Sequence, residues 1–253
     1  MVKELSDVHV IAGSVINNGK RTTSLQSLYA HYFFVTMAAL FIVIALAGFV
    51  PSYQSLHAGT LTVHWFVHIH GALMSSWLLI FLTQAILAAR GFLKFHRQLG
   101  QLSVVLGVFV LASMCIVTFR ALIGYPPRTN ELSWDLLLLQ LSAILLFGLF
   151  FVWGIRARKK AATHKRLLLL ATLILIQAGI GRIQWLPWPV IAKPSLSGIP
   201  NPCLIFLYVD LLLIPLFIYD LLTLKRIYKT TLVGSVCMIV VHLFITAVWS
   251  YLV

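Results

Sequence analysis

Charged residues are scarce in this chain. Of its 253 residues, 60% are hydrophobic and only 10% are charged, whereas a soluble domain carries about 25% charge. This balance excludes a soluble domain and indicates an integral membrane protein.

Acidic residues and cysteines are also few. Six Asp and Glu stand against 19 Lys and Arg, which gives a net charge of +13. The three cysteines, Cys115, Cys203 and Cys237, are scattered without metal-ligand spacing, so they are expected to be packed thiols. The first 30 residues are mixed polar and lack the apolar core of a cleavable signal.

Apolar runs close to or above the roughly 18 residues that span a bilayer recur along the chain. They predict an all-α fold, a polytopic bundle of seven transmembrane helices. Residues 1–30 are expected to form a cytoplasmic N-terminal segment, and 31–253 the transmembrane domain. The predicted spans are 31–50, 61–89, 103–122, 133–155, 166–186, 203–222 and 231–252.

The basic residues gather in alternate connections. They lie before the first span and in the second, fourth and sixth connections, for example at Lys20, Arg90, Lys159 and Arg226. The positive-inside rule therefore predicts an N-in, C-out topology. Membrane lipids are the expected partners of these charges. Nucleic acid is not expected as a partner, because no basic soluble domain is present.

The three basic connections between spans look alike. Each enters a new helix with a ring side chain and then a base: His96-Arg97, His164-Lys165 and Tyr228-Lys229. One interpretation is a leading helix followed by three hairpins of one ancestral type. The alternative is independent snorkelling of basic side chains at helix starts, in which His96 and His164 serve as interfacial anchors rather than catalytic groups.

Three stretches, "HIHGALMSSWLLIFLTQAILAARGFLKFHRQLG", "HKRLLLLATLILIQAGIGR" and "YVDLLLIPLFIYD", resemble a family of uncharacterised bacterial seven-helix membrane proteins. The resemblance extends over all seven spans, and Tyr228 departs from it, because such proteins often carry histidine there. It implies no activity. A weaker similarity is to cytochrome b561-type haem proteins, which also have a histidine in a span and another after a short basic turn. The family's recurring features map onto His68, His70, Trp77, Gln84, His96, Arg97, Gly100, His164, Lys165, Arg166, Arg182, Asp210 and Asp220.

Ionisable side chains inside spans are costly, about 2.5–3.5 kcal/mol at mid-helix, and are candidates for function. "VHWFVHIHGALM", residues 63–74, contains three of them. His64 and His68 are four residues apart and share a helix face, whereas His70 points about 200° away from His68. Depth along the helices predicts that His68, Asp210 and Arg182 lie at the same level in the outer half of the bundle. Asp210 and Arg182 would form an ion pair there. His242 is expected near the depth of His70.

These residues leave several functions open. A haem b could be held by His70 and His242, since a bis-histidine site needs one ligand from each of two helices at equal depth. A transition metal could be bound by His64, His68 and Asp210. Either would support electron transfer or oxidoreduction.

The alternatives use the same polar layer. Arg120 and Arg182, with Gln177 and Gln184 as a polar stripe, could bind or transport a small anion, a lipid or a quinone. The chain could equally be a structural accessory subunit of a larger membrane complex. Whether it is an enzyme stays undecided, because no nucleophile is evidently paired with a base.

Overall fold

The computed structural model describes residues 2–123, 134–183, 185–186 and 202–252. In this part of the chain there are eight α-helices and no strand, and seven helical segments are long and apolar enough to cross a membrane. The predicted all-α, seven-helix architecture is confirmed. The helices are α1 (Val2–His57), α2 (Trp65–Ala89), α3 (Leu93–Leu122), α4 (Trp134–Arg156), α5 (Ala161–Ile180), α6 (Pro202–Leu211), α7 (Ile214–Leu224) and α8 (Lys229–Leu252).

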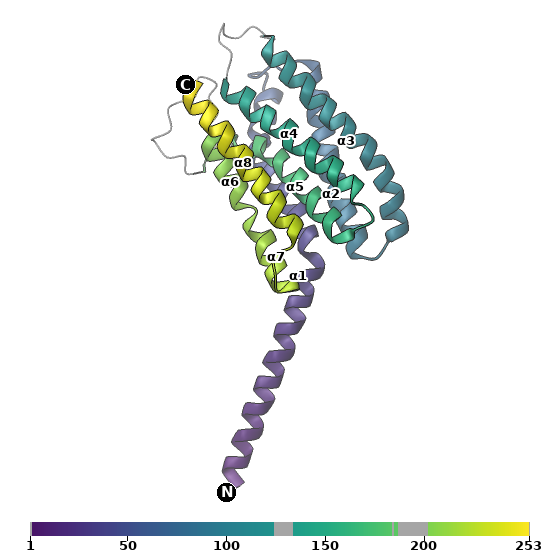
Figure 1. The fold of residues 1–253 in the computed structure, drawn as a ribbon, viewed down its shortest axis with the longest axis vertical. Coiled ribbons are helices and arrows are strands. Elements are labelled where there is room, and N and C mark those ends of the chain that lie inside the picture. The colour runs from purple at the N-terminus through teal and green to yellow at the C-terminus, as the bar shows by residue number, and fades with distance from the viewer. Residues whose placement is uncertain (1, 124–133, 184, 187–201, 253) are drawn as a thin grey trace.

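Two predicted span boundaries were wrong. The first helix does not end at residue 50 but continues through Pro51 to His57. A proline removes one backbone donor and kinks or ends many helices, yet here the helix continues beyond it. The third helix begins at Leu93 rather than at residue 103, because its first turns are amphipathic and escape a search for purely apolar runs. Figure 1 shows α1 extending well beyond the bundle at its N-terminal side.

The sixth span is broken in the middle. Helix α6 ends at Leu211 and α7 begins at Ile214, with Pro215 in its first turn. Across the break, the Leu212 and Leu213 amides donate to the carbonyls of Val209 and Asp210. The break therefore coincides with Pro215 and closely follows Asp210.

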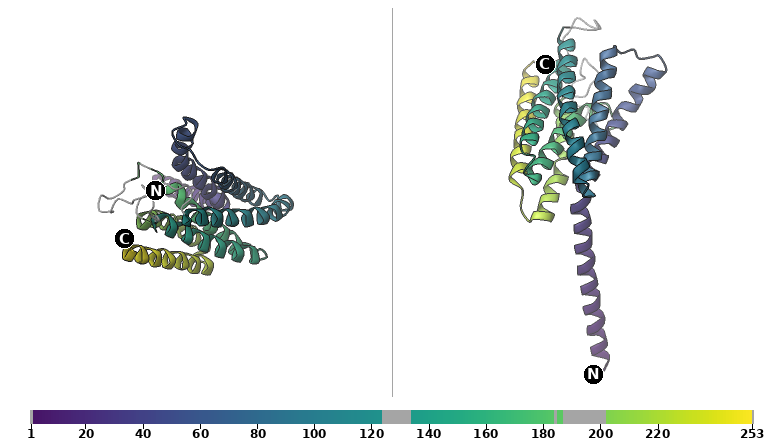
Figure 2. Two further views of the ribbon diagram at one scale, coloured as in Figure 1. Left: turned by 90° about the horizontal axis from the view of Figure 1, so that it is seen from above. Right: turned by 90° about the vertical axis from the view of Figure 1, so that its right-hand side faces the viewer.

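The helices run up and down in hairpins, so alternate connections meet at the same end (Figures 1 and 2). The turns at residues 90–92, 157–160 and 225–228 lie together. We call this the basic end, because Arg90, Arg158, Lys159, Lys160 and Arg226 lie in or beside these turns. The C-terminus lies at the opposite end.

Helix α5 is the centre of the bundle. It packs on α1, α4, α6 and α8, and its residues 167–176 are almost all buried. Apart from Thr172, that stretch is purely aliphatic, and a helix that is apolar on every side is expected in the interior.

Two glycines let α1 and α5 touch through their backbones. A Cβ atom placed on Gly48 would lie 2.1 Å from the carbonyl oxygen of Gly179, and one on Gly179 would lie 3.3 Å from the Ala45 Cα. Small residues at such crossings are typical of membrane helix pairs. The contact places the C-terminal end of α5 beside α1, at the end of the bundle opposite to the basic end.

Candidate functional site

Two histidines at the basic end are held in the same way. His96 lies in the first turn of α3, and its Nδ1 is 3.3 Å from the carbonyl oxygen of Gln84 on α2. His164 lies in the first turn of α5, and its Nδ1 is 2.8 Å from the carbonyl oxygen of Gly154 on α4. A carbonyl only accepts, so each Nδ1 must carry the proton. In a neutral ring, Nε2 is then an acceptor.

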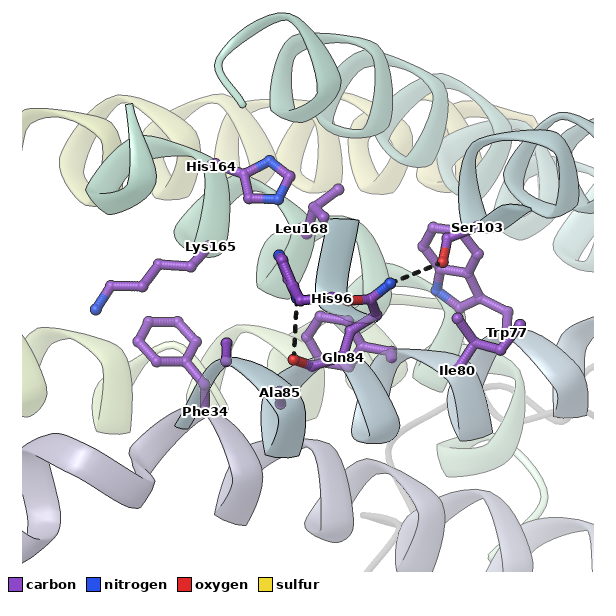
Figure 3. A pocket seen from close by; sticks show the side chains of 12 residues that line it. Phe34, Trp77, Ile80, Gln84, Ala85, His96, Ser103, His164, Lys165 and Leu168 are labelled. Atoms are coloured by element: carbon purple, nitrogen blue, oxygen red, sulfur yellow. Dashed lines mark hydrogen bonds between the residues drawn. The ribbon is translucent and has the colours of Figure 1, made fainter. Parts of the chain in front are cut away.

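The two imidazoles share one pocket. Figure 3 shows them pointing toward one another, and the His96 nitrogen that is not bonded to Gln84 lies on the side facing His164. The pocket has a cavity volume of about 90 Å³ and is partly open to the surroundings. It is lined by Phe34, Trp77, Ile80, Phe81, Gln84, Ala85, Ala88, His96, Ser103, His164, Lys165 and Leu168.

The hydroxyl and indole donors around the pocket are already used. Ser103 Oγ donates to the Leu99 carbonyl at 2.8 Å and accepts from Gln84 Nε2 at 3.3 Å. Trp77 Nε1 donates to Thr172 Oγ1 at 3.2 Å. Gln84 Oε1 is buried and has no hydrogen-bond partner among the described residues. The pocket therefore presents acceptors: this amide oxygen and two imidazole nitrogens.

Lys165 supplies the positive charge of the pocket. Its Nζ donates to the Tyr219 hydroxyl at 2.9 Å and lies 4.6 Å from the centroid of the Phe34 ring. This combination of one hydrogen bond and a cation–π contact holds the ammonium group at the pocket wall.

A buried ion pair fixes the helix turn that carries His164 and Lys165. Arg166 is 1% exposed and Asp220 is fully buried. The guanidinium donates to Asp220 Oδ1 through Nη2 and, at 3.0 Å, through Nε. The other oxygen, Oδ2, accepts from the Tyr228 amide at 2.9 Å and from Thr231 Oγ1 at 2.6 Å. This carboxylate therefore ties α5 to α7 and α8.

The chemistry of the pocket follows from these groups. Convergent acceptors in an apolar wall can bind a hydrogen-bond donor or an electron-pair acceptor such as a metal ion. No carboxylate is among the lining residues, and the Lys165 ammonium repels a bare cation. The arrangement is better suited to a neutral or acidic molecule that carries hydroxyl groups.

The residues expected to bind a metal do not form a cluster. No group of three His, Cys, Asp or Glu within the described ranges is arranged to hold a metal ion. His64 precedes α2 and its ring lies 4.8 Å from that of Phe66, His68 is exposed, and Asp210 is on α6. Helix α2 packs mainly on α3 and α1, whereas α6 packs on α5 and α8. Equal depth therefore did not make these residues neighbours.

The two histidines expected to hold a haem have separate partners. His70 Nδ1 lies 3.0 Å from Ser113 Oγ on α3. Because that hydroxyl donates its proton to the Val110 carbonyl, His70 must be the donor. His242 Nδ1 lies 2.8 Å from Asp210 Oδ1. The two rings thus belong to different helix pairs, α2–α3 and α6–α8.

The prediction of an ion pair between Asp210 and Arg182 was wrong, because Asp210 pairs with His242. Arg182 Nη1 donates to the Ala178 carbonyl at 2.6 Å, and its guanidinium lies 4.7 Å from the centroid of the Phe49 ring. Arg120 lies over the Phe66 ring at 5.6 Å. Gln177 links α5 to the Leu139 carbonyl of α4 at 2.8 Å. Gln184 lies outside the described residues.

The pocket itself was missed in the sequence, where His96 and His164 were interpreted as interfacial anchors. The available signal was their equivalent position: each begins the second helix of a hairpin just after a basic turn. Equal position in two hairpins implies equal depth, which is the condition for two side chains to meet. Trp77, Gln84 and Lys165, which carry part of the family resemblance, line the same pocket.

Comparison of the chain with protein-family models, with curated proteins and with solved structures gives no match. The function must therefore be inferred from the geometry of the site.

Proposed function

We propose that this membrane protein binds the hydroxyl-bearing ring of an amphipathic phenol or quinol in the pocket at its basic end. The observation that carries the proposal is the facing pair His96 and His164, each with Nδ1 bonded to a backbone carbonyl. Their Nε2 atoms would accept hydrogen bonds from two hydroxyl groups of one ring. An apolar tail would remain in the lipid.

Three further properties support a ring of this kind. The walls are mostly aromatic and aliphatic, which suits the face of a ring. Gln84 Oε1 is a buried acceptor without a partner among the described residues, and a donor on the ligand would satisfy it. The Lys165 ammonium favours a hydroxyl that becomes acidic or a ligand that carries negative charge.

A metal-centred cofactor held by the same two histidines is the second candidate. Imidazoles that ligate a metal usually donate their other N–H to a carbonyl or carboxylate, as His96 and His164 do. Haem b or a transition-metal ion would supply electron transfer. The cavity volume of about 90 Å³ is less than the roughly 150 Å³ that takes one benzene ring, so a quinol ring already extends into the open side of the pocket. The much larger porphyrin needs far more of that open side. This candidate therefore ranks second.

We infer that the basic end faces the cytoplasm of a bacterial cell, with the chain in the plasma membrane. The support is the collection of Lys and Arg at one end of the bundle, where anionic lipid head groups are attracted. The pocket would then be reached from the cytoplasmic half of the bilayer.

Binding of decylubiquinol to the purified protein in lipid nanodiscs tests the proposal. Titration under argon should show saturable binding, and His96→Ala and His164→Ala should each weaken it about 10-fold. One hydrogen bond contributes about 1–1.5 kcal/mol, and 1.4 kcal/mol corresponds to tenfold in affinity. The matched control is His68→Ala, which removes an exposed histidine of α2 and should leave binding unchanged.

The same preparation separates the two candidates. Absence of quinol binding, or equal binding by both pocket variants, would exclude the quinol proposal. A Soret band, or one metal ion per chain by elemental analysis, that disappears in His96→Ala and His164→Ala would instead establish the cofactor candidate.

A further inference from the structure

A second pair of ionisable groups lies away from the pocket, inside the span of α8. His242 is 2% exposed, and its ring stacks on Phe206 with centroids 4.2 Å apart and planes 7° apart. Its Nδ1 donates to Asp210 Oδ1 at 2.8 Å. The position is deep, because His242 is 13 residues, about 20 Å, from the start of α8.

The other nitrogen of this ring has an unusual environment. His242 Nε2 is buried and has no hydrogen-bond partner among the described protein groups. Three other buried atoms on the helices that pack with α8 or on α8 itself share that property: Gln140 Oε1 on α4, Gln177 Oε1 on α5 and Ser235 Oγ on α8. An unsatisfied polar atom in an apolar interior costs about 1–3 kcal/mol, so a group held at such a cost is a candidate for function.

The net charge of the Asp210–His242 pair favours the binding of a proton. With a neutral imidazole, the Asp210 carboxylate leaves one net negative charge inside the membrane. Addition of a proton at His242 Nε2 produces an imidazolium beside the carboxylate, and the pair becomes neutral overall. A low-dielectric interior favours the neutral pair over the lone charge.

We propose that Asp210 and His242 form an intramembrane proton-binding site, with His242 Nε2 as the atom that gains and loses the proton. The reaction is imidazole plus proton to imidazolium, while Asp210 stays ionised and keeps its bond to Nδ1. The carboxylate side chain is 21% exposed and precedes the break between α6 and α7. This proposal uses none of the pocket residues and is independent of the proposed ligand.

No other charged group is placed against the pair by the described helices. On α4 and α5, which pack on α8, the ionisable residues with described side chains lie at the basic end, at Arg156 and 164–166. Helix α8 carries Lys229 in its first turn, at the same end. Arg182 follows α5 and is bonded to its own helix at the Ala178 carbonyl. Asp210 is therefore the charge that sets the protonation of His242.

Nitrogen-15 NMR of histidine-labelled protein in nanodiscs tests this proposal. The His242 signals are identified by their loss in His242→Gln. Between pH 5 and pH 8 the wild-type ring should gain its second proton, and the doubly protonated fraction should be larger in the wild type and in Asp210→Glu than in Asp210→Asn. Asparagine keeps an oxygen that accepts from Nδ1, so the ring retains its position. The exposed His68 serves as an internal control, whose signals should be the same in all three proteins.

Two results would overturn the proposal. One is a His242 ring that stays singly protonated from pH 5 to pH 8 in the wild type. The other is the same protonated fraction in Asp210→Asn as in the wild type.

A second measurement leaves Asp210 unchanged, so it tests the proposal even if Asp210→Asn does not fold. In pH-difference infrared spectra of protein labelled with carbon-13 aspartate, one carboxylate band should shift in the wild type and not in His242→Gln. A wild-type spectrum without that shift would also overturn the proposal.

Discussion

The buried Arg166–Asp220 pair should dominate the stability of the basic end. Asp220→Ala removes the acceptor of the guanidinium, the Tyr228 amide and the Thr231 hydroxyl in one step. Breaking a buried ion pair from one side costs about 3–5 kcal/mol, because the remaining charge is left uncompensated. Arg166→Met should cost less, since Asp220 keeps its amide and hydroxyl donors.

The double variant isolates the coupling energy between Arg166 and Asp220 from their other interactions. Arg166→Met with Asp220→Ala removes both charges, so its loss of free energy should be at least about 2 kcal/mol smaller than the sum of the single losses. Unfolding in mixed micelles of dodecylmaltoside and SDS, followed by tryptophan fluorescence, measures all four proteins. Lys159→Met is the control, because this exposed lysine of the preceding turn should change stability by less than about 0.5 kcal/mol. Single losses that add within about 0.5 kcal/mol would refute the coupling.

Two further predictions concern packing and topology. Gly48→Ala should destabilise the protein by about 1–3 kcal/mol, because its Cβ would meet Gly179 oxygen at 2.1 Å, whereas Gly148→Ala, whose Cβ would lie 3.7 Å from Leu111, should be tolerated. Unchanged micelle unfolding of Gly48→Ala would show that α1 and α5 are not in backbone contact. An alkaline phosphatase fused after Val253 should be active, and a green fluorescent protein at the same position dark. The reverse pattern would place the C-terminus in the cytoplasm and contradict the inferred orientation.

Helix number and hairpin order could be predicted from sequence because the bilayer imposes a length on each apolar run. The break after Asp210 could be predicted as well, since Pro215 cannot supply a backbone donor. The boundaries at His57 and Leu93 could not, because helices extend past the hydrocarbon into amphipathic turns.

The sequence could not predict which helices are neighbours and which of their faces are in contact. Lipid-facing and protein-facing sides of a membrane helix are both apolar, so hydrophobic pattern does not show which face meets which partner. Depth placed Asp210, Arg182 and His68 in one layer, but rotation decided that Asp210 meets His242. Position in the repeated hairpins was the better guide to contacts, since it applies to His96 and His164.

The two polar sites are separated along the bundle by the centre of α5. Residues 167–176 are aliphatic except for Thr172, and that hydroxyl already donates to the Leu168 carbonyl and accepts from Trp77. Ten helical residues extend about 15 Å. This stretch thus offers no free side-chain donor or acceptor that could pass a proton from the Asp210–His242 pair to His164. Along α5, therefore, ligand binding at the basic end and protonation of His242 are expected to be separate events.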